Sequence, residues 1–249
     1  MSSLSCRALF FLSFSFLLAE PKWFADEQAL RTAGYFAEEQ AISQKIEQNS
    51  RSVSLYSKRG DLRMFLGNFS GSLLDYEKMI QLDPATEISH WRLGIAYFYS
   101  GLFKKASDQF EIYHQYDSVD RENGIWRFMS QVKEIGVVQA RKNLLPYVKN
   151  DRPPYPLLYD LFREKLETAD IFRLIDQAGF DPEYKERVLF HATLYAGIYT
   201  ETVDGNIELA QEYLRAAVLN KYGRSTGTYM WQVARLHYKQ LEQDKKKGK

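Results

Sequence analysis

Two stretches of the sequence that align at a fixed distance decide the fold. Residues 60–84 read GDLRMFLGNFSGSLLDYEKMIQLDP, and residues 94–118 read GIAYFYSGLFKKASDQFEIYHQYDS. A fixed period of this length is typical of a protein built from helical repeats. The matching positions lie 34 residues apart and comprise the pairs Gly60–Gly94, Gly67–Gly101, Phe69–Phe103, Ser72–Ala106 and Tyr76–Phe110.

Each recurring residue type has a physical task in a pair of packed helices. Gly60 and Ser72 are small because two helices approach closely at these points, and Tyr76 fills the space opposite. Gly67 ends the first helix, where the backbone takes a left-handed conformation that glycine adopts without steric cost. Pro84 stops the second helix because proline cannot continue it. The sequence therefore predicts one helix–turn–helix unit in each period.

Weaker copies of the unit follow. A third, degenerate unit is predicted over 121–150, where one further period brings Ala140 and Leu144 into register. A late unit contains Gly197 thirteen residues before Ala210, whereas Gly60 lies twelve before Ser72, so one inserted residue is predicted in its turn. The residues of this unit that match the first one are Gly205 for the turn glycine Gly67, Ile207 for Phe69, Ala210 for Ser72 and Leu214 for Tyr76, and Ala217 is a second small residue.

The remaining segments break the period. Residues 26–48 are predicted to be helical with Asp26 as the cap. The Pro-rich stretch 151–156 is predicted to be an extended connection, followed by helices near 157–164 and 168–178, the second capped by Thr168. The predicted organisation is a signal peptide or short apolar anchor at 1–19, an N-terminal capping helix at 20–50, units one to three at 51–150, an irregular helical connector at 151–185, a C-terminal unit at 186–240 and a basic tail at 241–249.

Composition and motifs disfavour several classes of function. The 33 Lys and Arg residues nearly balance the 32 Asp and Glu residues, so no strong field attracts nucleic acid. The single cysteine, Cys6, excludes an internal disulfide framework and a multi-cysteine zinc site. The four histidines are scattered, and the sequence carries no nucleotide, metalloprotease or nucleophile-elbow motif. We therefore expect no catalytic residue, metal, cofactor or small-molecule substrate.

The N-terminus carries an export signature. Arg7 precedes the apolar run Ala8–Ala19, whose twelve residues are too few to span a bilayer core of roughly 30 Å as a helix. The run has the length of a signal-peptide core, with cleavage expected after Ala19 and Leu17 at the position where a small residue is preferred. Cys6 precedes the run, so no lipidation site is predicted. The alternative is an uncleaved apolar anchor.

The signature residues resemble the tetratricopeptide family, and the order of segments is similar to the NlpI-type tetratricopeptide lipoproteins of the bacterial envelope. The stretches that carry the second resemblance are His90–Gly101 and Phe190–Gly197, within about residues 50–240. The resemblance implies an all-α tetratricopeptide solenoid with an irregular helical insert, and an envelope scaffold that binds proteases or cell-wall hydrolases and can form a homodimer. This chain departs from the lipoprotein pattern because it lacks the lipid-attachment cysteine.

By the same resemblance, the first helix of each unit lines a concave face that binds proteins. The second unit presents apolar residues at all five such positions, and aromatic residues are enriched in interface cores. Lys133 holds one of these positions in the third unit. The alternative is that a neighbouring helix, either the N-terminal one or the 157–178 insert, covers these side chains as ordinary core. The predicted partner-binding residues are Met64, Phe65, Ile88, Trp91, Ile95, Phe98, Tyr99 and Met129.

The function predicted from the sequence is a non-catalytic protein-interaction scaffold, exported to the periplasm or envelope. An intracellular or membrane-tethered adaptor with an uncleaved N-terminus is the first alternative. An enzyme that carries a repeat domain is the second, but only residues 150–183 stay unassigned, and they are too few for a catalytic unit.

Overall fold

The computed structural model describes residues 21–246 and consists, over this range, of helices joined by turns, with no strand. The predicted all-α class is confirmed. The elements are α1 Lys22–Gln48, α2 Val53–Phe65, α3 Phe69–Leu82, the 3₁₀ helix η1 Pro84–Ser89, α4 Trp91–Tyr99, α5 Phe103–Tyr116, α6 Arg121–Ile135, α7 Val137–Lys142, α8 Tyr155–Phe162, α9 Thr168–Gln177, α10 Pro182–Tyr199, the π-helix η2 Thr200–Asp204, α11 Ile207–Leu219, α12 Lys221–Thr226 and α13 Tyr229–Lys246.

The close approaches predicted from the period are present in the first two helix pairs. A Cβ atom at Gly60 on α2 would lie 2.5 Å from Cε1 of Tyr76 on α3. A Cβ atom at Gly94 on α4 would lie 2.6 Å from Cζ of Phe110 on α5. Both contacts are shorter than real Cβ atoms tolerate, so each helix pair requires glycine at this point.

The predicted turns and stops are also present. Gly67 and Gly101 follow α2 and α4 with φ angles of 78° and 73°, in the left-handed region that glycine adopts without strain. Asn68 then caps α3 by accepting a hydrogen bond from the backbone N–H of Gly71 at 3.0 Å. α3 ends at Leu82, directly before the predicted proline stop.

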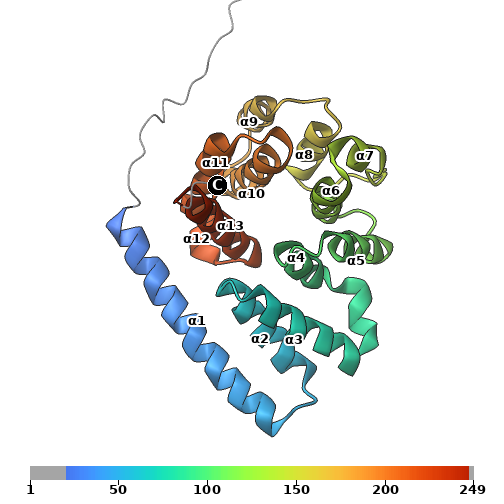
Figure 1. The fold of residues 1–249 in the computed structure, drawn as a ribbon. Helices are drawn as coiled ribbons and strands as arrows, with labels where there is room; N and C mark the ends of the chain where they lie inside the picture. Colours follow the sequence, from blue (N-terminus) through green and yellow to red (C-terminus); the bar gives the residue numbers. More distant parts are fainter. Residues whose placement is uncertain (1–20, 247–249) are drawn as a thin grey trace, which may run out of the picture.

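Figure 1 shows the helices from α2 to α11 arranged around an arc, with α13 against the inner side of the arc. α1 lies across the open side and contacts both ends. Its Glu39 pairs with Arg63 of α2 at 3.0 Å, and its Glu27 pairs with Arg224 of α12 at 2.7 Å. The first and last parts of the chain are therefore joined directly.

Two predicted helix starts and one predicted helix cap are wrong by a few residues. α1 begins at Lys22 rather than at Asp26, because Pro21 suits the entry to a helix. α8 begins at Tyr155, inside the stretch predicted to be extended, because Pro156 lies in the first turn, where its missing N–H is not needed. Glu167, not Thr168, caps α9, in a reciprocal capping box with Asp170.

The third unit is shortened. α7 ends at Lys142, so Leu144, predicted to be the large residue of this pair, lies outside any helix. Tyr147 is instead the large residue that packs against the small residue of this pair, because its hydroxyl would lie 2.5 Å from a Cβ atom at Gly124 on α6. The degeneracy of this copy thus shows as a second helix of six residues followed by a non-helical segment.

The late helix pair accommodates its extra residue in a π-helix. A Cβ atom at Gly197 on α10 would lie 2.8 Å from Cγ of Leu214 on α11, so the close approach recurs here. Between them, α10 continues into η2, and a π-turn is the usual result of inserting one residue into an α-helix. The predicted insertion is therefore located at Thr200–Asp204.

The chain's two ends were predicted to be separate segments. α13 continues to Lys246, through part of the predicted basic tail, and its Leu241 is buried. The predicted signal peptide at 1–19 and residues 247–249 lie outside the described residues. Among residues 21–246, no helix combines the length and the hydropathy needed to cross a bilayer.

Candidate functional site

α13 occupies the inner side of the first two helix pairs. The ring of Tyr229 contacts the ring of Phe65 at a centroid distance of 5.3 Å and that of Trp91 at 4.9 Å. Further along α13, the guanidinium of Arg235 donates to the carbonyl oxygen of Phe65 at 2.5 Å. This face of the arc is therefore packed against the chain's own last helix.

Most of the predicted partner-binding residues are buried by this arrangement. The sequence left open whether these residues form an open binding face or are covered as core. Four of the eight are core residues: Met64, Ile95, Phe98 and Met129 are at most 6% exposed. Phe65, Trp91 and Tyr99 are partly buried and pack against the core. Whether any of the eight contacts a partner remains a prediction.

Two details of that prediction need correction. The cover comes chiefly from α13 rather than from the 157–178 insert, although α1 contributes Tyr35, whose ring lies 5.6 Å from that of Phe65. Ile88 does not lie on the first helix of its unit, because α4 starts only at Trp91. Ile88 belongs to η1 and is 43% exposed.

A small pocket stays open on the inner side where α4, α5, α6, η2 and α13 meet. Its volume is about 190 Å³. Phe98, Tyr99, Phe103 and Leu241 supply the apolar part of the lining. The polar part comprises Lys133, Glu201, His237, Gln240 and Asp244. The pocket thus contains two of the eight predicted residues, together with the predicted groove position Lys133.

Glu201 organises the polar side of this pocket. It accepts from Lys133 at 3.0 Å, and His237 Nε2 lies 3.4 Å from its other oxygen. Burial alone would raise the pKa of Glu201, but the hydrogen bond and charge of His237, followed by the charge of Lys133, outweigh burial and lower this pKa to about 2. Tyr99 completes the chain of contacts with its hydroxyl 2.8 Å from His237 Nδ1. The pocket therefore presents a fixed carboxylate beside an aromatic wall.

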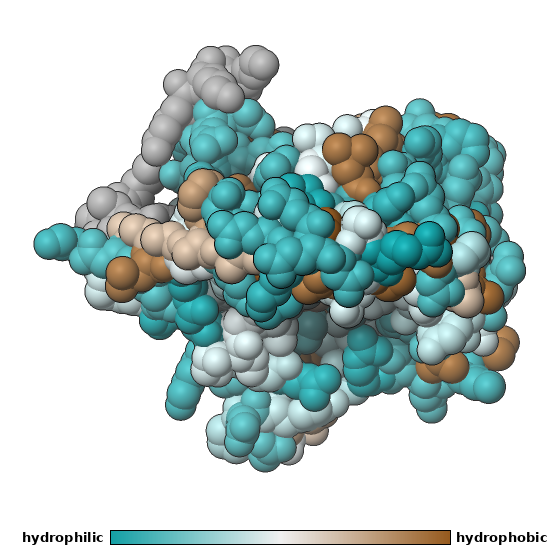
Figure 2. Space-filling view, turned by 90° about the horizontal axis from the view of Figure 1, so that it is seen from below, coloured by the Kyte–Doolittle hydropathy of each residue, from teal (hydrophilic) through white to brown (hydrophobic). Residues whose placement is uncertain are grey.

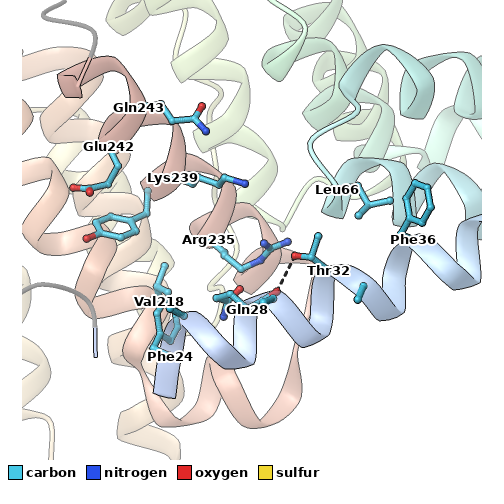
Figure 3. A pocket seen from close by; sticks show the side chains of 14 residues that line it. Phe24, Gln28, Thr32, Phe36, Leu66, Val218, Arg235, Lys239, Glu242 and Gln243 are labelled. Carbon is cyan, nitrogen blue, oxygen red and sulfur yellow. Dashed lines mark hydrogen bonds between the residues drawn. The ribbon is translucent and has the colours of Figure 1, made fainter. Parts of the chain in front are cut away.

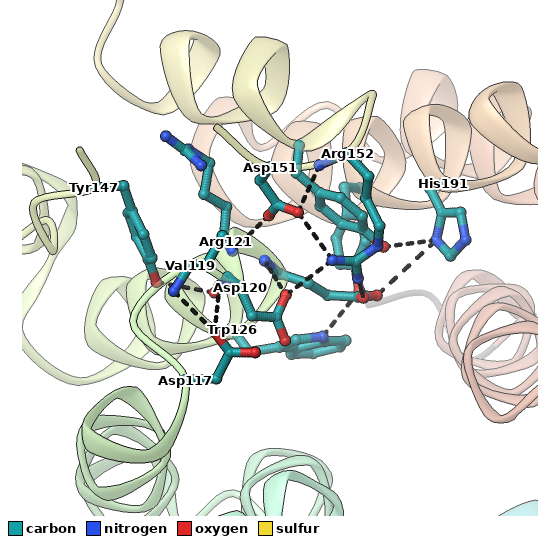
Figure 4. A network of polar contacts seen from close by, with 12 residues as sticks. Asp117, Val119, Asp120, Arg121, Trp126, Tyr147, Asp151, Arg152 and His191 are labelled. Carbon is teal, nitrogen blue, oxygen red and sulfur yellow. Dashed lines mark hydrogen bonds and ion pairs between the residues drawn. The ribbon is translucent and has the colours of Figure 1, made fainter. Parts of the chain in front are cut away.

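A second polar network joins α6, the connector and α10 (Figure 4). Glu122 at its centre receives a hydrogen bond from Tyr195 and one from Arg152, the latter at 3.0 Å. His191 Nδ1 lies 2.9 Å from the Tyr155 hydroxyl. Burial raises the pKa of Tyr155 and of Tyr195 and lowers the pKa of His191, so these three side chains stay neutral near pH 7. These properties favour a role in fixing the three segments together.

Asp120 gives this network a pH dependence. Burial first, then the charges of Glu122 and Asp151, raise its pKa to about 7, with Arg152 opposing. In the unfolded chain the carboxyl titrates near pH 4. Between these values the folded state holds a proton that the unfolded state has released, so the stability contributed by Asp120 falls as the pH rises from about 4 to 7.

Asp120→Asn is therefore expected to raise the melting temperature at pH 8 by ~4 °C, for a gain of roughly 1–2 kcal/mol, and to change it little at pH 4. Asparagine keeps the cap on the N–H of Glu122, which Asp120 now bonds at 3.1 Å. Thermal unfolding across pH 4–8.5 measures this effect. The exposed Asp108→Asn is the control, and equal shifts at both pH values in Asp120→Asn would contradict the assignment.

Sequence reasoning missed Glu201 and His237. Glu201 lies in the π-helix, where the inserted residue removes the period that identified the other positions. His237 lies on α13, whose position on the inner face depends on contacts far apart in the chain. The one signal in the sequence was the thirteen-residue spacing between Gly197 and Ala210, which marks the irregular turn but not its side chains.

Comparison of the chain with models of known protein families gives no match. Within the part of the chain that the structure describes, no group of three or more His, Cys, Asp or Glu side chains is placed to hold a metal ion.

Proposed function

We propose that this chain is a non-catalytic scaffold of the tetratricopeptide type that binds proteins in the periplasm or envelope of a bacterium. The observation that carries the proposal is the repeated close packing of glycine against a large aromatic residue, 34 residues apart in α2–α3 and α4–α5. Helix pairs repeated in this way form extended inner surfaces on which other proteins bind.

The inner pocket at Glu201 is the proposed place of contact. The aromatic wall of Phe98 and Phe103 offers apolar area, and the ionised Glu201 offers an acceptor of fixed position. Interfaces commonly combine an apolar centre with a few oriented polar groups. The partners expected from the family resemblance are envelope proteases or cell-wall hydrolases, and a second copy of the chain.

Filling the pocket tests this contact. Gln240 is exposed at the pocket rim, so Gln240→Trp is expected to occlude the pocket without disturbing the core. We expect at least ~5-fold less capture of envelope proteins, corresponding to about 1 kcal/mol, measured by quantitative mass spectrometry. Lys245→Trp, also exposed on α13 but outside the pocket, is the matched control. Equal capture by the two variants would contradict a role for the pocket.

Export is tested by the mature N-terminus. Intact-mass measurement of the protein purified from its native cells is expected to give a chain that begins at Glu20. A chain that retains Met1 would support the intracellular or membrane-tethered adaptor instead.

A further inference from the structure

Much of the surface of α1 is exposed to solvent. Of its 27 residues, only Phe24, Glu39, Ile42 and Ile46 are buried. Its large apolar side chains are exposed: Leu30 by 75%, Phe36 by 59% and Trp23 by 49%. Figure 2 shows a largely hydrophilic face of the molecule over which hydrophobic residues are scattered.

A groove runs between α1 and α13 (Figure 3), and of the three exposed apolar residues only Phe36 lines it. Its volume is about 780 Å³, within the range of protein binding pockets. The α1 wall presents Ala25, Ala29 and Ala33, spaced one helical turn apart, with Phe36 beyond them. Alanines in this spacing permit another helix to approach closely, because no side chain beyond Cβ separates the backbones.

The base of the groove holds polar groups without partners. Both polar atoms of the Gln28 amide are buried, and neither forms a hydrogen bond with any described residue. Such groups cost free energy while they lack partners.

The α13 wall carries the charged side chains Arg235, Lys239 and Glu242. Arg235 and Lys239 lie four residues apart and both line the groove. Lys239 is exposed and makes no ion pair with the described side chains, whereas Glu242, further along the wall, accepts a hydrogen bond from Gln211 at 3.4 Å. Arg235 is buried, and its guanidinium already donates to the carbonyl oxygen of Phe65 and to the side chain of Gln232. The exposed charge of Lys239 is therefore the one that matches a carboxylate on an occupant.

We propose that this groove binds one amphipathic helix of a protein partner, with its apolar side against the alanines of α1 and acidic residues facing Lys239. The mode is that of a helix laid in an apolar groove. The proposal concerns a second surface, separate from the inner pocket, so each can fail without the other.

The test uses a defined probe. A fluorescent 18-residue helical peptide carries Leu and Ala along one side and Glu at two flanking positions four residues apart, and a matched peptide carries Lys there. Fluorescence anisotropy is expected to show about fivefold tighter binding of the acidic peptide, the upper end for an exposed ion pair. Lys239→Glu is expected to reverse the preference. Equal binding of the two peptides would overturn the proposal.

Two variants of α1 locate the site. Ala33→Arg places a long charged side chain in the groove and is expected to weaken the acidic peptide at least tenfold. Ala37→Arg, one turn further and outside the groove lining, is the matched control. Both residues are exposed, so the melting temperature should stay unchanged. Loss of binding in both variants, or in neither, would overturn the assignment.

Two other occupants give distinct results. If sedimentation shows a dimer that Ala33→Arg converts to a monomer, the groove belongs to a second copy of the chain and the proposal is wrong. If the acidic peptide binds a chain that begins at Glu20 but not the full chain, the apolar residues 8–19 occupy the groove and the proposal is again wrong. A monomer that binds the peptide equally in both lengths supports it.

Discussion

Gly94→Val is expected to lower the free energy of unfolding by at least about 3 kcal/mol, since overpacking a well-packed core costs typically 1–3 kcal/mol and here meets an aromatic ring. Its Cβ atom would lie 2.6 Å from Cζ of Phe110 and 2.7 Å from Cε1. Phe110 is 1% exposed, so its ring lies in a closely packed core that resists its displacement. Urea unfolding followed by circular dichroism measures the loss.

A second substitution separates the clash from a general intolerance of valine. Phe110→Leu shortens the opposing side chain, and the double variant Gly94→Val/Phe110→Leu is expected to be more stable than the sum of the single changes predicts. Gly34→Val on α1 is the control, because a Cβ atom there meets no described atom within 4 Å. Strict additivity in the cycle would argue against direct contact as the cause.

The double variant Trp91→Ala/Phe98→Ala is expected to unfold the protein rather than to weaken one binding face. Phe98 is 6% exposed and contacts three aromatic rings, of which Trp126 is at 5.2 Å and Phe103 at 5.6 Å. Removing such a side chain costs about 3–5 kcal/mol. Trp91 adds the loss of its contact with Tyr229. The total approaches the ~5–15 kcal/mol that stabilises a typical domain.

Helical circular dichroism and the melting temperature measure this result. Ile88→Ala is the control from the same predicted face, because Ile88 is 43% exposed and should change stability by less than ~0.5 kcal/mol. A folded double variant with an unchanged melting temperature would show that these aromatic residues are not core, contrary to their burial against α13.

The packing within each helix pair could be predicted because it depends on the spacing of residues that lie close together in the sequence. Gly60 and Tyr76 are sixteen residues apart, and their contact depends only on one turn and two helices of regular length. The same regularity located the end of α3 and, through one extra residue, the irregular turn at η2. Resemblance to a repeat family adds the expected role of each position, but it does not supply contacts between distant units.

The position of α13 could not be predicted from the sequence. Most of the inner pocket could therefore not be predicted either, because α13 forms one of its walls. Tyr229 reaches Phe65 across more than 160 residues, and no period relates the two. Burial of Phe98 or Met64 also looks the same in sequence as exposure on an apolar binding face, because both require apolar side chains at helical spacing. The choice between core and interface depends on where another helix lies.

The contacts of α1 have a consequence for how the chain folds. In an open array of repeats each unit meets only its neighbours, so units can form and unravel one by one. Here the hydroxyl of Tyr35 accepts a hydrogen bond from Gln232 at 2.6 Å, although the two residues are separated by 197 positions. Closing so long a loop is costly before its contacts form and slows folding. In return, α1 and α13 cannot separate without breaking this bond, so residues 21–246 are expected to melt in one cooperative step.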